Sequence, residues 1–278
     1  MNITSACRRK PDLPAAATLR QCFEDVDRRA ASGDQTGALD IIAALVERHP
    51  DRSIEFLARA HPIVRGLEDR SRYELYQQRL FNFPIGAGDR VLDIGSGHMP
   101  FPLATHLADI AVADDRYGRA GVAFRWIEGK PVYEVPLEDT GFADKEFDFV
   151  YCSHVLEHAT DPERACAELI RIAKRGYIET PSRTKDFFLQ MAGVSNHRWA
   201  VEMDGDALAI TEYTPQDIAG IGSDVLLHMC CDPVTEREKA FKVLLVLNAD
   251  RVNTMMMWED GFDYSVRRTN GTAAVAGA

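Results

Sequence analysis

The sequence predicts an α/β protein in which helices cover a mostly parallel sheet, with a helical appendage at the N-terminus. Residues 91–94 form a short apolar strand that runs directly into a glycine turn at residues 95–97. Further apolar strands and an amphipathic helix follow as far as Pro181, and this order is typical of a parallel sheet. Before residue 82, apolar residues recur at helical spacing, which predicts the appendage.

Residues 1–60 are expected to form this appendage. Apolar positions recur at helical spacing in two blocks over residues 18–49, and the break at residues 32–34 makes the segment a helical hairpin that Pro50 closes. The hairpin resembles a single tetratricopeptide-type repeat. A solenoid needs roughly three such repeats, so we expect a packing or dimerisation surface, able to pair two chains, rather than a peptide-binding array.

The glycine turn indicates a bound nucleoside. In open α/β sheets ligands bind at the carboxyl ends of strands, and a carboxylate roughly 20 residues further on holds the ribose hydroxyls. Asp114 and Asp115 end the next apolar segment at about that distance. The dinucleotide fingerprint would need a third glycine, but Pro100 stands near that place and should shorten or reshape the following helix. The turn and the acids together predict an adenosine-containing ligand.

Two motifs resemble those of the class I S-adenosylmethionine-dependent methyltransferases. Residues 93–97 read Asp-x-Gly-x-Gly, which resembles motif I of that family. Residues 142–148 read Phe-x-Asp-x-x-Phe-Asp before a fourth strand, and residues 156–158 read Leu-Glu-His after it. This resembles a second signature of the family, with Gly141 in place of the usual proline. A helix and a fifth strand at residues 176–181 follow in the family's order.

The resemblance implies a Rossmann-like, seven-stranded, mostly parallel sheet sandwiched by helices in residues 61–268. Cap elements would be inserted at about residues 182–215, including a hairpin at residues 196–211. The resemblance also implies S-adenosyl-L-methionine as the cofactor and S-adenosyl-L-homocysteine as the product. The tail at residues 269–278 is small and apolar, and we expect it to be disordered.

The expected cofactor residues follow the same resemblance. Asp93 should anchor the methionine end of the cofactor, the backbone at residues 95–97 should leave it room, and either Asp114 or Asp115 should hold the ribose. The complete expected set is Asp93, Gly95, Ser96, Gly97, His98, Asp114, Asp115, Glu138, Asp139, Ser153 and His154.

Two histidines, His154 and His197, are the candidate catalytic bases. An oxygen acceptor is a poor nucleophile while it is protonated, so a base that titrates near neutral pH would help, and histidine suits this role. A structural, hydrogen-bonded imidazole is the alternative for either residue, and His158 is expected to be structural. The residues that could hold an acceptor, unless they form a solvated face, are Arg183, Lys185, Arg198 and Trp199.

No metal site is predicted from the sequence. His154-x-x-Glu157-His158 matches the inverted zinc-protease pattern, but it straddles a strand end and a loop instead of one helix. Some ubiquinone-type O-methyltransferases carry a similar Glu-x-x-Glu-His cluster with a divalent metal. His154 stands in place of the first glutamate, which weakens that analogy.

Composition narrows the remaining choices. The net charge of −11 disfavours binding to nucleic acid, and no apolar run is long enough to span a bilayer. Six cysteines without paired spacing indicate reduced thiols in a cytoplasmic protein. We therefore expect a methyltransferase for a small-molecule or glycan-like acceptor, methylated at oxygen. N-methylation of an amine or peptide, and a non-catalytic cofactor-binding scaffold, stay as alternatives.

Overall fold

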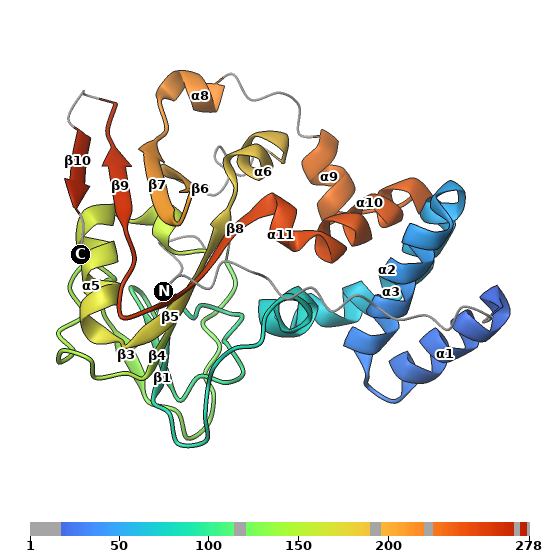
Figure 1. The fold of residues 1–278 in the computed structure, drawn as a ribbon, viewed down its shortest axis with the longest axis horizontal. Coiled ribbons are helices and arrows are strands. Elements are labelled where there is room, and N and C mark those ends of the chain that lie inside the picture. The colour runs from blue at the N-terminus through green and yellow to red at the C-terminus, as the bar shows by residue number, and fades with distance from the viewer. Residues whose placement is uncertain (1–17, 114–120, 190–195, 220–224, 270–272, 277–278) are drawn as a thin grey trace. The chain divides into compact units, whose positions relative to one another are not determined.

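The computed structural model describes residues 18–113, 121–189, 196–219, 225–269 and 273–276 (Figure 1). The chain divides into two compact units. The sheet unit contains Pro84–Ser223 and Asp250–Ala278, together with Met1–Ser5, and the helical unit contains Ala6–Phe83 and Asp224–Ala249. Among the described residues, no helix combines the length and the apolar character needed to cross a membrane.

The sheet unit is built on a six-stranded sheet in the order β3-β2-β1-β4-β5-β8. The first five strands are parallel, and β8 runs antiparallel to β5. This confirms the predicted Rossmann-like, mostly parallel sheet between helices. The strands are β1 (Val91–Ile94), β2 (His106–Asp109), β3 (Val132–Glu134), β4 (Phe149–Ser153), β5 (Arg175–Pro181) and β8 (Asn253–Glu259).

The predicted count of seven strands differs from the six found in this sheet, because the later strands pair elsewhere. Among the described residues, four strands form a second sheet in the order β10-β9-β7-β6. The expected hairpin is present as β6 and β7, which turn at Gly205 with a φ of 61°. The tail also differs from expectation, because Ala273–Ala276 pairs with β9. The strands are β6 (Trp199–Asp204), β7 (Ala207–Glu212), β9 (Tyr264–Arg267) and β10 (Ala273–Ala276).

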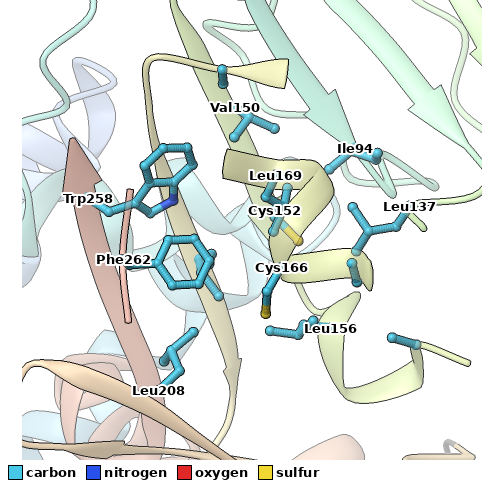
Figure 2. Packing of buried hydrophobic residues seen from close by; sticks show 14 of the residues in the cluster. Ile94, Leu137, Val150, Cys152, Leu156, Cys166, Leu169, Leu208, Trp258 and Phe262 are labelled. Atoms are coloured by element: carbon cyan, nitrogen blue, oxygen red, sulfur yellow. The ribbon is translucent and has the colours of Figure 1, made fainter. Parts of the chain in front are cut away.

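The central strands are mostly hydrophobic and buried along their whole length because both faces of the sheet are covered. Every residue of β1 and β4 is buried. The helix α5 (Pro162–Ile172) covers one face, and it begins where the Asp161 carboxylate accepts a hydrogen bond from the Arg164 amide. Figure 2 shows Cys166 of α5 beside Cys152 of β4, close to the ring of Phe262, in the core of this unit.

Short helices complete the sheet unit. The 3-10 helix η3 follows β4 and ends at His158. The helix α6 follows β5, and the side chain of Ser182 caps its N-terminus. These two elements carry several of the candidate site residues. Their bounds and those of the other short helices are η3 (Leu156–His158), α6 (Arg183–Phe188), α8 (Pro215–Ala219) and α11 (Ala249–Val252), the last of which spans the division between the units.

The helical unit contains the predicted hairpin together with further helices from two separate parts of the chain. The hairpin turns at Gly33, whose φ is 88°, and the side chains of Thr18 and Asp34 cap its two helices. The unit continues to Phe83 and takes in residues 224–249, whereas a boundary at residue 60 was expected. Its elements are α1 (Leu19–Ala31), α2 (Gln35–Arg48), η1 (Pro50–Arg52), α3 (Ser53–Leu67), η2 (Tyr73–Gln77), α4 (Gln78–Leu80), α9 (Val225–Cys231) and α10 (Glu236–Leu247).

The larger extent of the helical unit has a physical reason. The helix α3 runs through Pro62 to Leu67, so no break exists at the expected boundary. Lys242 of α10 then forms an ion pair of 2.5 Å with Glu68, directly after α3, and its side chain is almost fully buried. The sequence pattern contains no local signal for this pairing of distant helices.

Candidate functional site

The candidate site is formed by the segments that leave β1 and β4. These strands are neighbours, with Ile94 paired to Cys152, so both segments leave the sheet at the same edge. That edge carries the carboxyl ends of the parallel strands, where ligands bind in open α/β sheets. The segment after β1 is the glycine turn, and the segment after β4 begins at His154 and includes the Leu-Glu-His motif at residues 156–158.

The glycine turn is held in place by backbone hydrogen bonds and by a close contact with Val155. Gly95 has a φ of 74°, and a Cβ atom there would stand 2.1 Å from a methyl group of Val155. The amides of Gly95 and Ser96 both donate to the carbonyl of Ala108, at 2.8 and 3.0 Å. Gly95 is therefore required by the contact with the segment after β4, and the amides of Gly95 and Ser96 already have an acceptor within the fold.

Two buried carboxylates hold the same turn. Asp93 accepts a hydrogen bond of 2.7 Å from the Phe101 amide. Asp109 accepts hydrogen bonds from the amides of Gly97, at 2.9 Å, and Ala111, at 3.1 Å. Asp109 is the last residue of β2, which is the position where a ribose-binding carboxylate is expected.

Sequence reasoning missed Asp109 because it assumed the usual spacing. Asp114 and Asp115, the predicted ribose ligands, lie outside the described residues. In the described segment between β1 and β2 no helix forms, since Pro100 and Pro102 interrupt it, and β2 consequently ends sooner after the glycines. The two prolines were the available signal that the acid should be sought nearer the turn.

The other expected cofactor residues have varied surroundings. Glu138 accepts hydrogen bonds from the amides of Thr160, at 2.7 Å, and Asp161, at 3.4 Å, so it fastens the loop before α5. Asp139 is exposed and lies 3.6 Å from an Arg164 nitrogen. His98 is half-buried in the segment after the glycine turn.

The hydroxyls of Ser96 and Ser153 are both buried and have no hydrogen-bond partner. Ser96 follows β1 and Ser153 ends β4, so these two hydroxyls belong to the ends of neighbouring strands. Buried polar atoms in folded proteins nearly always have partners, and exceptions therefore point to a group that the protein binds. The pair indicates a polar ligand at this edge.

His154 occupies a special backbone position directly after β4. Its φ of 59° is in the left-handed region, which non-glycine residues adopt rarely and which is often found at functional sites. Its amide donates to the carbonyl of Glu179 at 2.7 Å. Its Nε2 lies 3.3 Å from the Glu179 carboxylate and its Nδ1 lies 3.4 Å from the Glu157 carboxylate. The imidazole is thus placed between two buried acids.

Glu179 anchors His154 and was not singled out by the sequence. It is fully buried in β5, where it accepts hydrogen bonds from the Tyr177 hydroxyl, at 2.6 Å, and the Asn253 amide group, at 3.0 Å. Lys185 donates to the side-chain oxygen of Asn253 at 2.7 Å. The sequence does contain a signal for Glu179, which is an acid inside an apolar strand. A buried glutamate is rare in proteins and needs hydrogen-bond partners, so such a residue often has a specific role.

His197 is buried at the back of this cluster. Its Nδ1 lies 2.8 Å from the Asp186 carboxylate, which also accepts a 2.8 Å hydrogen bond from the Tyr213 hydroxyl. Burial, together with the neighbouring Asp186 charge, raises the pKa of Tyr213 far above its ordinary value. The other ring nitrogen of His197 lies 4.0 Å from the Glu157 carboxylate. The structure thus brings both predicted histidines to Glu157.

Glu157 is the most unusual group of the cluster. It is fully buried, and neither carboxylate oxygen accepts a hydrogen bond. Burial opposes its ionisation, but the neighbouring imidazoles of His154, His158 and His197 outweigh this and lower the pKa of Glu157. Burial also lowers the pKa of His158. Glu157 is therefore a buried carboxylate that lies close to three histidines.

The predicted acceptor-binding residues do not form one group. Trp199 is fully buried and donates from its indole nitrogen to the carbonyl of Ala159, at 2.7 Å, so it is a core residue. Arg183 lies 3.1 Å from Asp217. Arg198 has an exposed side chain, and Lys185 belongs to the Glu179 network described above.

One family model matches the central segment of the chain. Residues 92–178 match the family model described as a methyltransferase domain, which covers slightly less than a third of the chain. The match begins in β1 and ends in β5, so it includes both segments of the candidate site. None of the curated proteins compared matches the chain.

Solved structures of methyltransferases are similar to this chain at low identity and with low TM-scores. A chain from the complex between the Haloferax volcanii Trm112 activator and a methyltransferase is 14% identical, with a TM-score of 0.39, covering 76% of this chain and 96% of that one. A Methanosarcina mazei methyltransferase is 19% identical, with a TM-score of 0.30, and covers 45% and 73%. A Thermotoga maritima methyltransferase is 18% identical, with a TM-score of 0.35, and covers 55% and 72%.

Proposed function

We propose that this chain, in which residues 92–178 form a class I S-adenosylmethionine-dependent methyltransferase domain, methylates an oxygen of a small-molecule or glycan-like acceptor. One observation carries the proposal. His154 follows β4 in a left-handed conformation, next to the strand that ends in the glycine turn, and a buried carboxylate lies behind its ring. This is the arrangement of a positioned general base.

The residues at the ends of β1, β2 and β4 fit the cofactor. The partnerless hydroxyls of Ser96 and Ser153 offer hydrogen bonds to its polar groups. Asp93 would orient the methionine end, and Asp109 would contact the ribose from the end of β2. When bound, S-adenosylmethionine supplies a sulfonium-activated methyl group, so the protein needs mainly to align the acceptor and to remove one proton.

His154 is suited to hold that proton. Glu179 lies 3.3 Å from its Nε2 and would stabilise the positive charge that forms when Nδ1 accepts a proton from the acceptor hydroxyl. Glu179 is itself fixed by Tyr177 and Asn253. We assign the base to His154 rather than His197, because both rings contact carboxylates but the side chain of His154 is 14% exposed and that of His197 only 3%.

Product formation tests the proposal. The purified full-length chain is incubated with methyl-labelled S-adenosylmethionine and a small-molecule extract, and both S-adenosylhomocysteine and labelled products are measured. We expect His154→Gln to lower kcat by about 10²–10⁴-fold with little change in cofactor affinity, since the base acts only in the chemical step. His228→Gln changes an exposed histidine of α9 and serves as the matched control.

Two outcomes would count against the proposal. An amine nitrogen that reacts in its neutral form needs no strong base, so full activity of His154→Gln would indicate an N-methyltransferase. Cofactor binding without any S-adenosylhomocysteine above the background of a boiled sample would indicate a scaffold protein.

A further inference from the structure

We propose that Glu157, His158 and His197 bind one divalent transition-metal ion of the Zn²⁺ class. One ligand atom from each residue lies within 4.8 Å of the other two. The first two residues belong to η3, and His197 lies two residues before β6, so the ion would join segments that are distant in the sequence. His197 also lies outside residues 92–178, which match the methyltransferase domain.

The first argument is the state of Glu157. Its carboxylate is fully buried, and neither oxygen has a hydrogen-bond partner. A buried carboxylate without hydrogen bonds destabilises the fold, and proteins normally avoid this by pairing the group or by binding a metal ion. The nearest imidazole nitrogen, in His154, is 3.4 Å away and does not complete a hydrogen bond. A cation beside Glu157 would remove this destabilisation.

The second argument is the orientation of the histidines. The Nδ1 of His197 lies 2.8 Å from the Asp186 carboxylate, and its Nε2 is the nitrogen nearer Glu157. A carboxylate that holds one ring nitrogen, so that the other can bind a metal, is the usual support of a metal-binding histidine. His158 likewise has a hydrogen bond with the Asn196 backbone. The two rings meet edge to face, with centroids 4.7 Å apart.

The ligand chemistry selects the kind of ion. Two imidazole nitrogens and one carboxylate oxygen suit Zn²⁺, Co²⁺ or Fe²⁺, whereas Ca²⁺ and Mg²⁺ prefer oxygen ligands only. Zn²⁺ binds such atoms at about 2.0–2.2 Å, so the three ligand atoms must approach one another by about 1 Å when the ion binds. Three protein ligands also leave a fourth position for water or another oxygen ligand.

The site would have a consequence for its surroundings. The ion would connect η3 with the chain just before β6 and would draw Glu157 away from His154. The Nδ1 of His154, which now lies 3.4 Å from that carboxylate, would then be released. The alternative is a cluster of ion pairs in which charged imidazoles alone balance Glu157, and metal titration separates the two.

The test uses the full-length protein after chelator treatment and desalting. Co²⁺ is titrated first, because its visible absorption reports the geometry of its ligands, and Zn²⁺ is then added to displace it. We expect one Co²⁺ per chain, intense bands typical of four or five ligands, loss of the bands on adding Zn²⁺, and a higher melting temperature with Zn²⁺.

Variants locate the site. Glu157→Gln and His197→Gln should each weaken Co²⁺ binding by about 100-fold or more, and Asp186→Asn, which keeps all three ligands, by about 10–100-fold. His228→Gln should bind as the wild type does. Circular dichroism checks that each variant is folded, and His158→Gln replaces any that is not. The proposal is overturned if the wild type gives only the spectrum of aqueous Co²⁺, or if the folded ligand variants bind as tightly as the wild type.

Discussion

The segments that follow β1 and β4 leave the same edge of the sheet, but they differ in how their polar groups are satisfied. After β1, the three amides of the glycine turn donate hydrogen bonds to the Ala108 carbonyl and the Asp109 carboxylate, and Asp93 accepts one from the Phe101 amide. After β4, Glu157 is buried without a hydrogen bond and His154 is held in a left-handed conformation. Apart from the partnerless hydroxyl of Ser96, the first segment is fixed by its own hydrogen bonds, whereas the second retains more groups that a ligand or a reaction would use.

Gly95→Ala should produce the largest loss of stability, because the added methyl group disrupts the contact between the two segments. An alanine would be strained at a φ of 74°, and its methyl group would overlap Val155. We expect the free energy of unfolding to fall by about 3 kcal/mol or more. Urea denaturation followed by tryptophan fluorescence measures this, since all three tryptophans lie in the sheet unit.

Gly129→Ala is the matched control for this change. Gly129 has a similar φ of 77°, but nothing lies within 4 Å of the position of its Cβ, so only the backbone strain of about 1 kcal/mol remains. Adding Val155→Ala to Gly95→Ala should recover part of the loss. Equal losses for the two glycine variants would show that Val155 does not constrain the turn.

Asp109→Ala tests the internal bonding of the first segment. It leaves the amides of Gly97 and Ala111 without their acceptor, so we expect a loss of about 2 kcal/mol in the free energy of unfolding and weaker binding of S-adenosylhomocysteine. Asp109→Asn keeps one acceptor oxygen and should lose less. Calorimetry measures the affinity, and an unchanged affinity in Asp109→Ala would exclude this residue from the cofactor site.

Glu168 provides a fully bonded carboxylate for comparison with Glu157. Arg171 and Thr140 both hydrogen-bond to it, and the Arg171 contact is the main reason that the pKa of Glu168 falls to about 2. A carboxylate with a lowered pKa stabilises the fold above its ordinary titration range near pH 4.5, and this contribution is lost as the pH falls toward 2. The melting temperature of Glu168→Gln should therefore lie below that of the wild type at pH 7 and approach it near pH 3.

Exposed Glu202 of β6 is the control, because Glu202→Gln removes the same charge without these bonds. A deficit of Glu168→Gln that stays the same at both pH values would contradict the assigned cause.

The parts of the fold that the sequence predicted depend on local chemistry. The apolar residues of β1, the glycines after it and the capped start of α5 all act over a few residues, so their patterns were readable. The pairing of the strands after β5 could not be predicted from the sequence. The strands β8 and β9 lie on either side of Gly261 and yet belong to different sheets. Nothing local in a strand specifies which sheet it joins.

The candidate site divides in the same way. The importance of His154 followed from its place after a predicted strand, whereas the contacts of Glu157 with His197 and of His154 with Glu179 arise only from tertiary packing. The ribose carboxylate was placed too far along the chain because the two prolines after the glycine turn remove the helix that the usual spacing assumes. The predictions for Asp114 and Asp115 stay open.

The most direct test of the account is hydrogen–deuterium exchange of the full-length protein with and without S-adenosylhomocysteine. Binding at the shared edge of β1 and β4 should slow exchange in peptides that cover residues 95–101 and 153–158, with the larger change after β4, where the polar groups are less satisfied. Unchanged exchange in both peptides at a saturating ligand concentration, or protection confined to the helical unit, would contradict it.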